Sequence, residues 1–219
     1  MFSMSKITYL AESAGQPLRE YVCSLGREIV TIKSEDVVDK SISDHPDIFL
    51  CKMGIDDDSP VYFAEKNNLG RDYPDDVSYN AACTGKYFIH NLAFTAPRLL
   101  DAAKTAGMTL IDVRQGYSKC SIVIVDETSL ITYDEGIVKA CSAYPELEVL
   151  KVSPGFVRLD GFDTGFIGGA SGRIGNEIIF NGDLFRHPDF ERIVEFIESR
   201  GLKCRWFSEY PLTDIGSIL

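Results

Sequence analysis

The chain has 219 residues, 45% of them hydrophobic, and a formal net charge of −11 at pH 7. This length and composition allow a full hydrophobic core, as one large domain or as a domain built from repeats. The acidic balance repels the phosphates of nucleic acids, so we expect no nucleic-acid partner, whereas small cationic or neutral ligands fit. No apolar run approaches the roughly 20 residues that span a bilayer, and the first ten residues lack the apolar core of a signal peptide. We therefore expect a cytoplasmic protein with no membrane partner.

The cysteines do not predict a metal site. No two of them have C-x-x-C spacing, and the three histidines are not grouped with them along the sequence, so we expect neither a metal nor an organic cofactor. A chain of this size without a secretion signal usually keeps its thiols reduced. The six cysteines are Cys23, Cys51, Cys83, Cys120, Cys141 and Cys204.

The first third of the chain predicts one complete strand–helix–strand unit and one incomplete unit. Residues 7–10 form a strand, a helix opens at Gln16-Pro17 and ends at Gly26, and residues 28–32 return as a strand. Residues 47–51 and 61–64 then predict two strands joined by an acidic turn. Turn-forming residues follow them, so we expect a loop in place of the helix of this unit.

The remaining chain repeats the strand–helix–strand order three times. The third unit has a strand at 87–89, a helix opening at 95–97 and a strand at 108–113. In the fourth, strands at 120–125 and 130–133 precede a helix capped by Asp134, and residues 147–152 return as a strand. In the fifth, a strand at 177–180 precedes a helix with apolar residues at i, i+3, i+4 and i+7, and a strand at 203–207 follows.

These units share a layout that predicts a ring. Shorter runs at 47–51, 78–84, 119–125 and 166–172 precede the main strands, while the first unit lacks such a run and residues 214–219 are left over at the end. Pairing residues 214–219 beside 7–10 completes five β-β-α-β units and removes the open sheet edges. We therefore expect one domain, 1–219, with units at 1–33 plus 211–219, 45–68, 78–113, 117–152 and 165–207. A doubly wound α/β sheet is the alternative, but it leaves the short first strands unexplained.

Five such units in about 220 residues resemble the pentein fold, the five-bladed α/β-propeller of the guanidino-group-modifying enzymes. That superfamily includes arginine deiminase, amidinotransferases and dimethylarginine dimethylaminohydrolase, and the ribosome anti-association factor uses the fold without catalysis. In the hydrolases the first strands of the units line a central channel. The resemblance places a nucleophilic cysteine on the last strand, a histidine on the strand before it, and carboxylates around the guanidinium.

The catalytic residues of that family transfer only in part. Leu212-Thr213-Asp214 resembles the family's Leu-Thr-Cys segment, but Asp214 stands where the nucleophile is expected. Residues 165–172 contain no histidine at the place of the general base. We therefore predict that guanidine hydrolysis by the family's own route is absent, because attack on the guanidinium carbon needs an activated thiolate.

Carboxylates near the starts of the first strands favour a cationic ligand. Asp47, Asp163 and Asp214 are candidates for gripping a guanidinium or amidine in an acidic central channel. For a single aspartate the alternative is a solvated turn or a helix cap. Asp214 differs because it lies inside an apolar terminal run, where a charge needs a partner.

Two further segments carry candidate residues. Lys119 and Cys120 open an apolar run, and an adjacent ammonium favours the thiolate, which makes Cys120 a candidate for a relocated nucleophile. The alternative is a buried structural cysteine beside a surface lysine. Asn80 offers hydrogen bonds in the corresponding segment of the third unit, and Gly168 and Gly169 allow a strand or ligand to approach closely at the centre.

Three functions are compatible with these residues. The first is recognition, and modification if a nucleophile is present, of a small cationic ligand such as a guanidino compound. The second is a non-catalytic module that binds a protein partner, like the anti-association factor. The third is a cysteine hydrolase that acts through Cys120.

Overall fold

The computed structural model describes residues 6–33 and 36–219 and shows a mixed α/β fold. Within these residues the strands form five small sheets, not one doubly wound sheet. In the last three sheets a middle strand pairs antiparallel with the strand before it and parallel with the strand that returns after a helix. The strands are β1 Ile7–Ala11, β2 Glu28–Ile32, β3 Leu50–Lys52, β4 Val61–Phe63, β5 Ala82–Cys83, β6 Tyr87–His90, β7 Thr109–Asp112, β8 Val123–Asp126, β9 Ser129–Thr132, β10 Glu148–Lys151, β11 Ser171–Ile174, β12 Glu177–Phe180 and β13 Lys203–Arg205.

Four longer helices connect middle strands to returning strands, as the sequence predicts. Each buries two residues spaced i and i+4 on one face, which is the spacing of an amphipathic helix that covers a sheet. The buried pairs are Leu18 and Val22 in α1 (Gln16–Ser24), Leu99 and Ala103 in α3 (Pro97–Thr105), Ile137 and Cys141 in α5 (Glu135–Cys141), and Ile193 and Ile197 in α6 (Phe190–Glu198). The short helices are α2 (Pro46–Phe49) and α4 (Ser118–Ser121), with 3-10 turns at Lys40–Ile42, Lys66–Asn68 and Leu184–Arg186.

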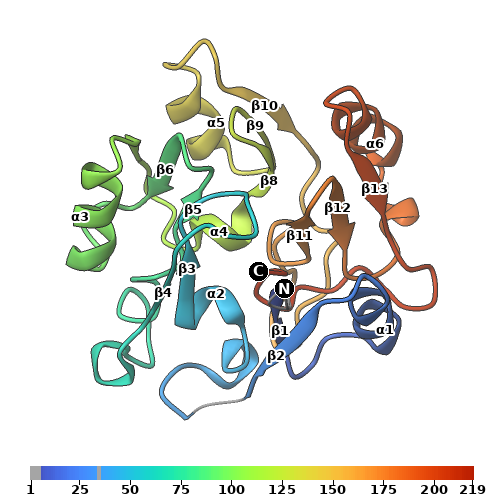
Figure 1. Cartoon of the computed structure of the whole chain (residues 1–219), viewed down its shortest axis with the longest axis horizontal. Helices are drawn as coiled ribbons and strands as arrows, with labels where there is room; N and C mark the ends of the chain where they lie inside the picture. Colours follow the sequence, from blue (N-terminus) through green and yellow to red (C-terminus); the bar gives the residue numbers. More distant parts are fainter. Residues whose placement is uncertain (1–5, 34–35) are drawn as a thin grey trace, which may run out of the picture.

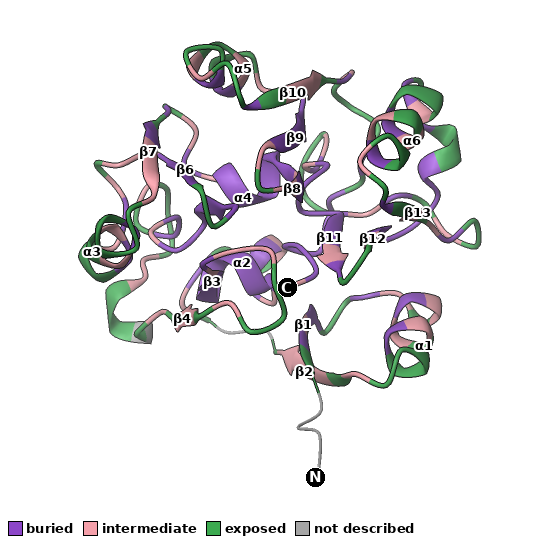
Figure 2. Ribbon diagram, turned by 45° about the horizontal axis from the view of Figure 1, so that its top comes forward, coloured by how far each residue is buried: buried purple, intermediate pink, exposed green. Residues whose placement is uncertain are grey.

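The five sheets are arranged around the middle of the molecule (Figure 1). The longer helices lie on the outside, whereas α2, α4 and the C-terminal end lie near the middle. Figure 2 shows the same division, with buried residues toward the centre and exposed residues on the outer faces of the long helices. The hydrophobic core divides into clusters between neighbouring units, and one of them joins Leu10 and Leu18 of the first unit to Ile179 and Phe207 of the last.

The C-terminal segment differs from the strand expected at residues 214–219. None of these residues is in a strand, because Gly216 and Ser217 have φ values of +65° and +72°, which interrupt an extended backbone. The segment still reaches β1, where the backbones of Tyr9 and Leu219 exchange two hydrogen bonds. Ile218 also donates a backbone hydrogen bond to Ser171 of β11.

Two of the expected first strands begin with a helical turn. The strands predicted at 47–51 and 119–125 are shorter in the structure, because α2 occupies 46–49 and α4 occupies 118–121. In the second unit Pro46, a residue suited to the first turn of a helix, begins α2. As predicted, no α-helix follows β4 in this unit, and residues 64–81 contain only the 3-10 turn. No helix within the described ranges is long and apolar enough to cross a bilayer.

Candidate functional site

Five chain segments meet at the centre of the molecule, one from each predicted unit. They are the two short helices α2 and α4, the approach to β5, the residues before β11, and the C-terminal segment. Backbone hydrogen bonds tie them together: Asp47 N donates to Gly216 O, Lys119 N to Asn80 O, and Gly169 N to Cys120 O. Seven of the eight predicted site residues are buried in these segments, namely Asp47, Asn80, Lys119, Cys120, Gly168, Gly169 and Asp214.

Cys120 is held among polar groups although it is only 3% exposed. Its thiol donates a hydrogen bond to Asp47 Oδ2 at 3.0 Å and accepts one from Asn80 Nδ2 at 3.3 Å. Asn80 Oδ1 also accepts from the backbone N–H groups of Lys119 and Cys120, at 2.9 and 3.1 Å. Asn80 therefore fixes the helical turn that presents the thiol.

The environment of Cys120 favours the neutral thiol. Burial raises the pKa of the thiol well above its usual value, and the charges of Asp47 and Asp214 raise it further. The charge of Lys119 does not offset this rise, although Lys119 and Cys120 lie close enough to interact electrostatically. In the helical turn the two neighbouring side chains project about 100° apart, and the ammonium of Lys119 donates to Ser217 Oγ at 2.9 Å.

Asp214 presents both carboxylate oxygens to the centre. Oδ1 accepts a hydrogen bond from Gly216 N at 3.0 Å, and Oδ2 accepts one from Phe166 N at 2.9 Å. Burial raises the pKa of this carboxyl, nearby His45 lowers it, and Asp47 raises it again. Each oxygen keeps lone-pair capacity for a ligand, because a carboxylate oxygen accepts about two hydrogen bonds.

A glycine beside Asp214 makes its position possible. A Cβ on Gly169 would lie 2.0 Å from Asp214 Oδ1, and a Cβ on Gly168 would lie 2.4 Å from the carbonyl oxygen of Ile122. Any larger residue at 169 would displace the carboxylate or the backbone. The predicted close approach at these glycines therefore involves the chain itself in this structure.

His45 is a site residue that the sequence patterns did not single out, because it falls in a polar connection. It lies just before α2, is 2% exposed, and its Nδ1 has no hydrogen-bond partner among the residues that the structure describes. Nδ1 lies 3.8 Å from Asp214 Oδ1. The available signal was Pro46, which marks a helix start and so places His45 at the end of α2 that faces the centre.

His45, Cys120 and Asp214 form a compact group from three distant parts of the chain. One nitrogen, sulfur or oxygen atom from each lies within 4.8 Å of the others. Within the described residues, these are the side chains that could hold a metal ion, and the set suits zinc with an open fourth position. Sequence spacing did not indicate this group, because the three residues are 75 and 94 positions apart along the chain.

A chain of hydrogen bonds extends from Cys120 to Lys119 through the C-terminal segment. Ser217 Oγ lies 2.6 Å from Asp47 Oδ2, and Lys119 Nζ donates to the same hydroxyl. Asp47 Oδ1 is buried and has no hydrogen-bond partner in the described part of the chain. Burial lowers the pKa of the Lys119 ammonium, and the charge of Asp47 opposes this shift. Ser217 was not predicted, since its role depends on the positive φ of the terminal turn.

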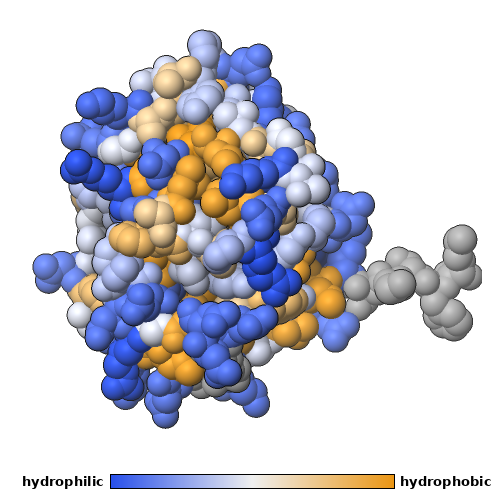
Figure 3. Space-filling model, turned by 90° about the vertical axis from the view of Figure 1, so that its left-hand side faces the viewer, coloured by the Kyte–Doolittle hydropathy of each residue, from blue (hydrophilic) through white to orange (hydrophobic). Residues whose placement is uncertain are grey.

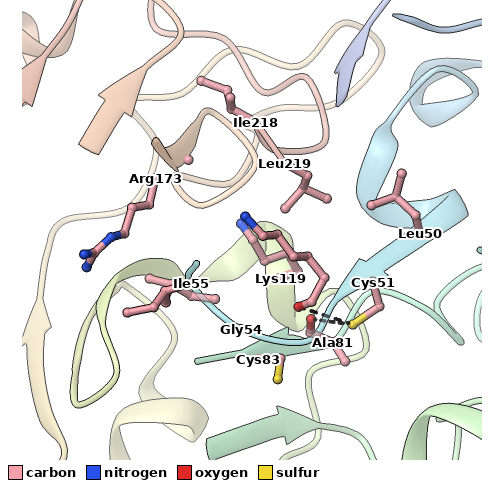
Figure 4. Close-up of a pocket in the computed structure, with 13 residues that line it drawn as sticks. Leu50, Cys51, Gly54, Ile55, Ala81, Cys83, Lys119, Arg173, Ile218 and Leu219 are labelled. Atoms are coloured by element: carbon pink, nitrogen blue, oxygen red, sulfur yellow. Dashed lines mark hydrogen bonds between the residues drawn. The ribbon is translucent and has the colours of Figure 1, made fainter. Parts of the chain in front are cut away.

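Two pockets adjoin this centre. Cys120 lines a cavity of about 190 Å³ together with His45 and Asp214, and its remaining walls are mostly apolar and aromatic. Lys119 lines a smaller cavity of about 40 Å³ with Cys51, Cys83 and Arg173. Figure 4 shows the smaller pocket, with the Lys119 side chain near its middle and Arg173 at one side.

Asp163 is the predicted site residue that the structure does not bring to the centre. It is exposed and lines a separate hollow of about 310 Å³ with Phe156, Arg158 and Pro211. This hollow borders the Cys120 pocket, because Leu159 and Phe162 line both.

Comparisons with known proteins give the fold and the family. A crystal structure of dimethylarginine dimethylaminohydrolase, as an adduct with 4-chloro-2-hydroxymethylpyridine, superposes with a TM-score of 0.53, covering 94% of this chain and 93% of that chain at 10% identity. This likeness supports a distant pentein-like fold. No curated protein matches the sequence. The model of the Family of unknown function (DUF6873) matches residues 10–219, and the chain therefore belongs to that family.

Proposed function

We propose that this protein binds a small planar cation of the amidine or guanidine type and acts on it through Cys120. The observation that carries the proposal is the meeting of a thiol, an imidazole and a carboxylate at one cavity, from Cys120, His45 and Asp214. A nucleophile, a general base and a charged group within reach of one ligand are the parts that covalent catalysis requires.

The charge and shape of the pocket favour a planar cation. Asp214 can accept two parallel N–H bonds, which matches the geometry of an amidinium or guanidinium group. The rings of Tyr117 and Phe166 line the same pocket with centroids 6.1 Å apart, and aromatic faces attract cations. The carboxylate of Asp47 lies behind the thiol and adds to the negative potential.

A bound cation would also activate the thiol. The pKa of Cys120 is raised partly by the charges of Asp47 and Asp214, and a positive ligand opposes both. His45, with its ring nitrogen within 4.8 Å of Sγ, takes the thiol proton, directly or through one water. The thiolate then attacks the central carbon of the ligand.

The reaction balances with water as the co-reactant. The S–C bond forms, the C–N bond to the leaving amine breaks, and His45 returns its proton to that amine. Water then adds to the same carbon, the C–S bond breaks, and the thiol is regenerated. An amidine becomes an amide plus ammonia, and a guanidine becomes a urea plus ammonia or an amine.

The proposal includes a closed five-bladed α/β-propeller, with units at 1–33 plus 211–219, 45–68, 78–113, 117–152 and 165–207. It is supported by the five sheets, by the backbone bonds between Tyr9 and Leu219, and by the core cluster that joins the first and last units.

The alternative function, a non-catalytic module that docks a protein partner, would be favoured by a large flat apolar patch on the surface. On the side shown in Figure 3, hydrophobic side chains reach the surface in separate groups between hydrophilic ones, which does not favour that alternative.

The test is amidine turnover measured with a thiol variant and a matched control. Wild-type protein is incubated with acetamidine, benzamidine or methylguanidine, and released ammonia or amine is measured. We expect release by wild type and by Cys23→Ser, since Cys23 is exposed on α1 and lies outside the pocket. Cys120→Ser is expected to show no release. Equal release by Cys120→Ser, or none by the wild type with any probe, would overturn the catalytic proposal.

A further inference from the structure

The walls of the Cys120 pocket carry information about the rest of the ligand. Apart from His45, Cys120 and Asp214, its lining consists of six apolar or aromatic residues and one threonine. The six are Ile42, Ile48, Tyr117, Leu159, Phe162 and Phe166. No lysine or arginine is among the described lining residues.

The two polar wall residues are already engaged elsewhere. The hydroxyl of Tyr117 donates to Asp76 Oδ2 at 2.5 Å, so its ring rather than its oxygen serves the pocket. The hydroxyl of Thr164 donates to Val157 O at 3.1 Å, with Gly165 O at 3.2 Å as a second acceptor. Neither hydroxyl is left to donate to a ligand without losing its present partner.

An anionic group on the ligand would therefore be buried close to Asp214, with no lysine or arginine among the described lining residues to pair with it. Burial of an unpaired charge is among the largest penalties in binding. Arg158 lines the neighbouring hollow and pairs there with Asp160 at 2.8 Å, and the ammonium of Lys119 lines the other pocket and donates to Ser217 Oγ. A second positive charge on the ligand would lack a partner in these walls as well.

The volume of the Cys120 pocket limits the size of the apolar part of the ligand. Its volume is about 190 Å³, somewhat above the roughly 150 Å³ of an apolar cavity that holds benzene. A phenyl ring or a short branched alkyl chain fits beside the cationic head group.

We infer that the ligand carries one positive charge on an amidine- or guanidine-type head and an otherwise apolar, uncharged body, and that Phe162 selects for this body. Phe162 is 55% exposed and belongs to both the pocket and the neighbouring hollow, so it forms the wall nearest to solvent. This inference rests on the proposed function for the cationic head and adds the class of the remainder. Arginine, with its carboxylate and ammonium, is excluded as a good ligand.

The experiment compares two probes that differ by one carboxylate. Binding of benzamidine and para-carboxybenzamidine to the wild-type protein is measured by calorimetry, which does not depend on turnover. We expect benzamidine to bind at least tenfold more tightly than para-carboxybenzamidine, and also at least tenfold more tightly than arginine. Equal or tighter binding of the carboxylated probe would overturn the inference.

A charge introduced at residue 162 should reverse the preference. Phe162→Arg is expected to improve binding of para-carboxybenzamidine at least tenfold relative to benzamidine, because it supplies the missing counter-charge. Phe156→Arg is the matched control, since Phe156 is 50% exposed and lines only the neighbouring hollow. An unchanged preference in Phe162→Arg, or the same change in Phe156→Arg, would remove Phe162 from its role.

The outcomes separate this inference from the proposed function. If neither benzamidine nor para-carboxybenzamidine binds, there is no cation site, and both the proposed function and this inference are wrong. If benzamidine binds selectively but Cys120→Ser still turns amidines over, the ligand class stands and the role of Cys120 fails. If turnover depends on Cys120 and carboxylated ligands bind best, the role of Cys120 stands and the ligand class fails.

Discussion

At the residue scale, the chemical properties of the candidate site residues depend on the groups that contact them. Asp214 was singled out in the sequence because a charge in an apolar run needs a reason, and the structure shows backbone donors from Gly216 and Phe166 around it. Cys120 was singled out for Lys119, yet the groups that contact its thiol are Asp47 and Asn80. The pKa of the thiol is raised first by burial and then by the charges of Asp47 and Asp214, and the ammonium of Lys119 does not offset this rise.

Replacing Asp214 with asparagine should weaken cation binding. Asp214→Asn keeps the size of the side chain and removes its charge, so benzamidine affinity is expected to fall about tenfold or more, the size of a charge-assisted contact. Calorimetry measures the change, and Asp163→Asn, an exposed carboxylate in the neighbouring hollow, serves as control. Equal affinity of Asp214→Asn and wild type would clear Asp214 of a ligand role.

The raised pKa of Cys120 predicts slow alkylation at neutral pH. With iodoacetamide and no ligand, the exposed Cys23 should react before Cys120, and the alkylation rate at Cys120 should still be rising above pH 9. The same pKa shift affects stability. Because the pKa of the thiol is higher in the folded state than its unfolded value of about 8.5, its contribution to the free energy of unfolding is present below about pH 8.5 and is lost as the pH rises above that value. Mass-spectrometric mapping that finds Cys120 the fastest thiol at pH 7 would contradict this prediction.

At the element scale, the short helical turns α2 and α4 explain the division of the centre into two pockets. In a strand, Lys119 and Cys120 would point to opposite faces, but in α4 they project about 100° apart and each reaches a different cavity. The segment before β11 packs closely at this centre because it contains two glycines. Gly169 leaves room for the carboxylate of Asp214, and Gly168 leaves room for the carbonyl oxygen of Ile122. The helical conformation of α4 therefore decides that Lys119 and Cys120 line different pockets.

Adding one methyl group at Gly169 should disturb both fold and site. In Gly169→Ala the new Cβ would lie 2.0 Å from Asp214 Oδ1, so the free energy of unfolding should fall by about 1–3 kcal/mol. Benzamidine affinity should fall as well, because the carboxylate is displaced. Chemical denaturation and calorimetry measure the two effects, and Gly136→Ala in α5 is the control for binding. Wild-type stability and affinity in Gly169→Ala would show that the contact is relieved without cost.

At the scale of the whole molecule, the C-terminal segment joins the first and last units and also supplies the site. Ile215 and Ile218 are buried in the cluster that contains Leu10 and Leu18, and Asp214 and Ser217 flank them at the centre. The proposed closure of the ring and the proposed site therefore both depend on residues 214–219.

Deleting residues 214–219 should expose β1 and the cluster behind it. We expect a loss of several kcal/mol, which for a protein of this size lowers the melting temperature by roughly 10 °C. If the truncated protein does not fold, Ile218→Ala provides the second measurement, with an expected loss of about 2–5 kcal/mol for a fully buried isoleucine. A truncated protein that melts within a degree or two of the full chain would rule out closure.

The sequence by itself determined the repeated order of strands and long helices, the helix-less second unit and the segments that meet at the centre. These features depend on local signals, such as the i, i+4 spacing in α1 and α6, Asp134 at the start of α5, and glycine just past the helix ends. Seven of the eight predicted site residues lie together for the same reason, because the repeat aligns the starts of the units.

Only the tertiary structure decided that His45 lies with Cys120 and Asp214, that the ammonium of Lys119 donates to Ser217, and that Asp163 lies outside the centre. The physical reason is that the direction of a side chain depends on one or two dihedral angles at its own position. The turns at 46–49 and 118–121 and the positive φ values of Gly216 and Ser217 set these directions, and contacts with distant segments hold them in place. Periodicity reports which face of an element is buried, whereas the chemistry of this site depends on which atoms of distant segments come within a few ångströms of one another.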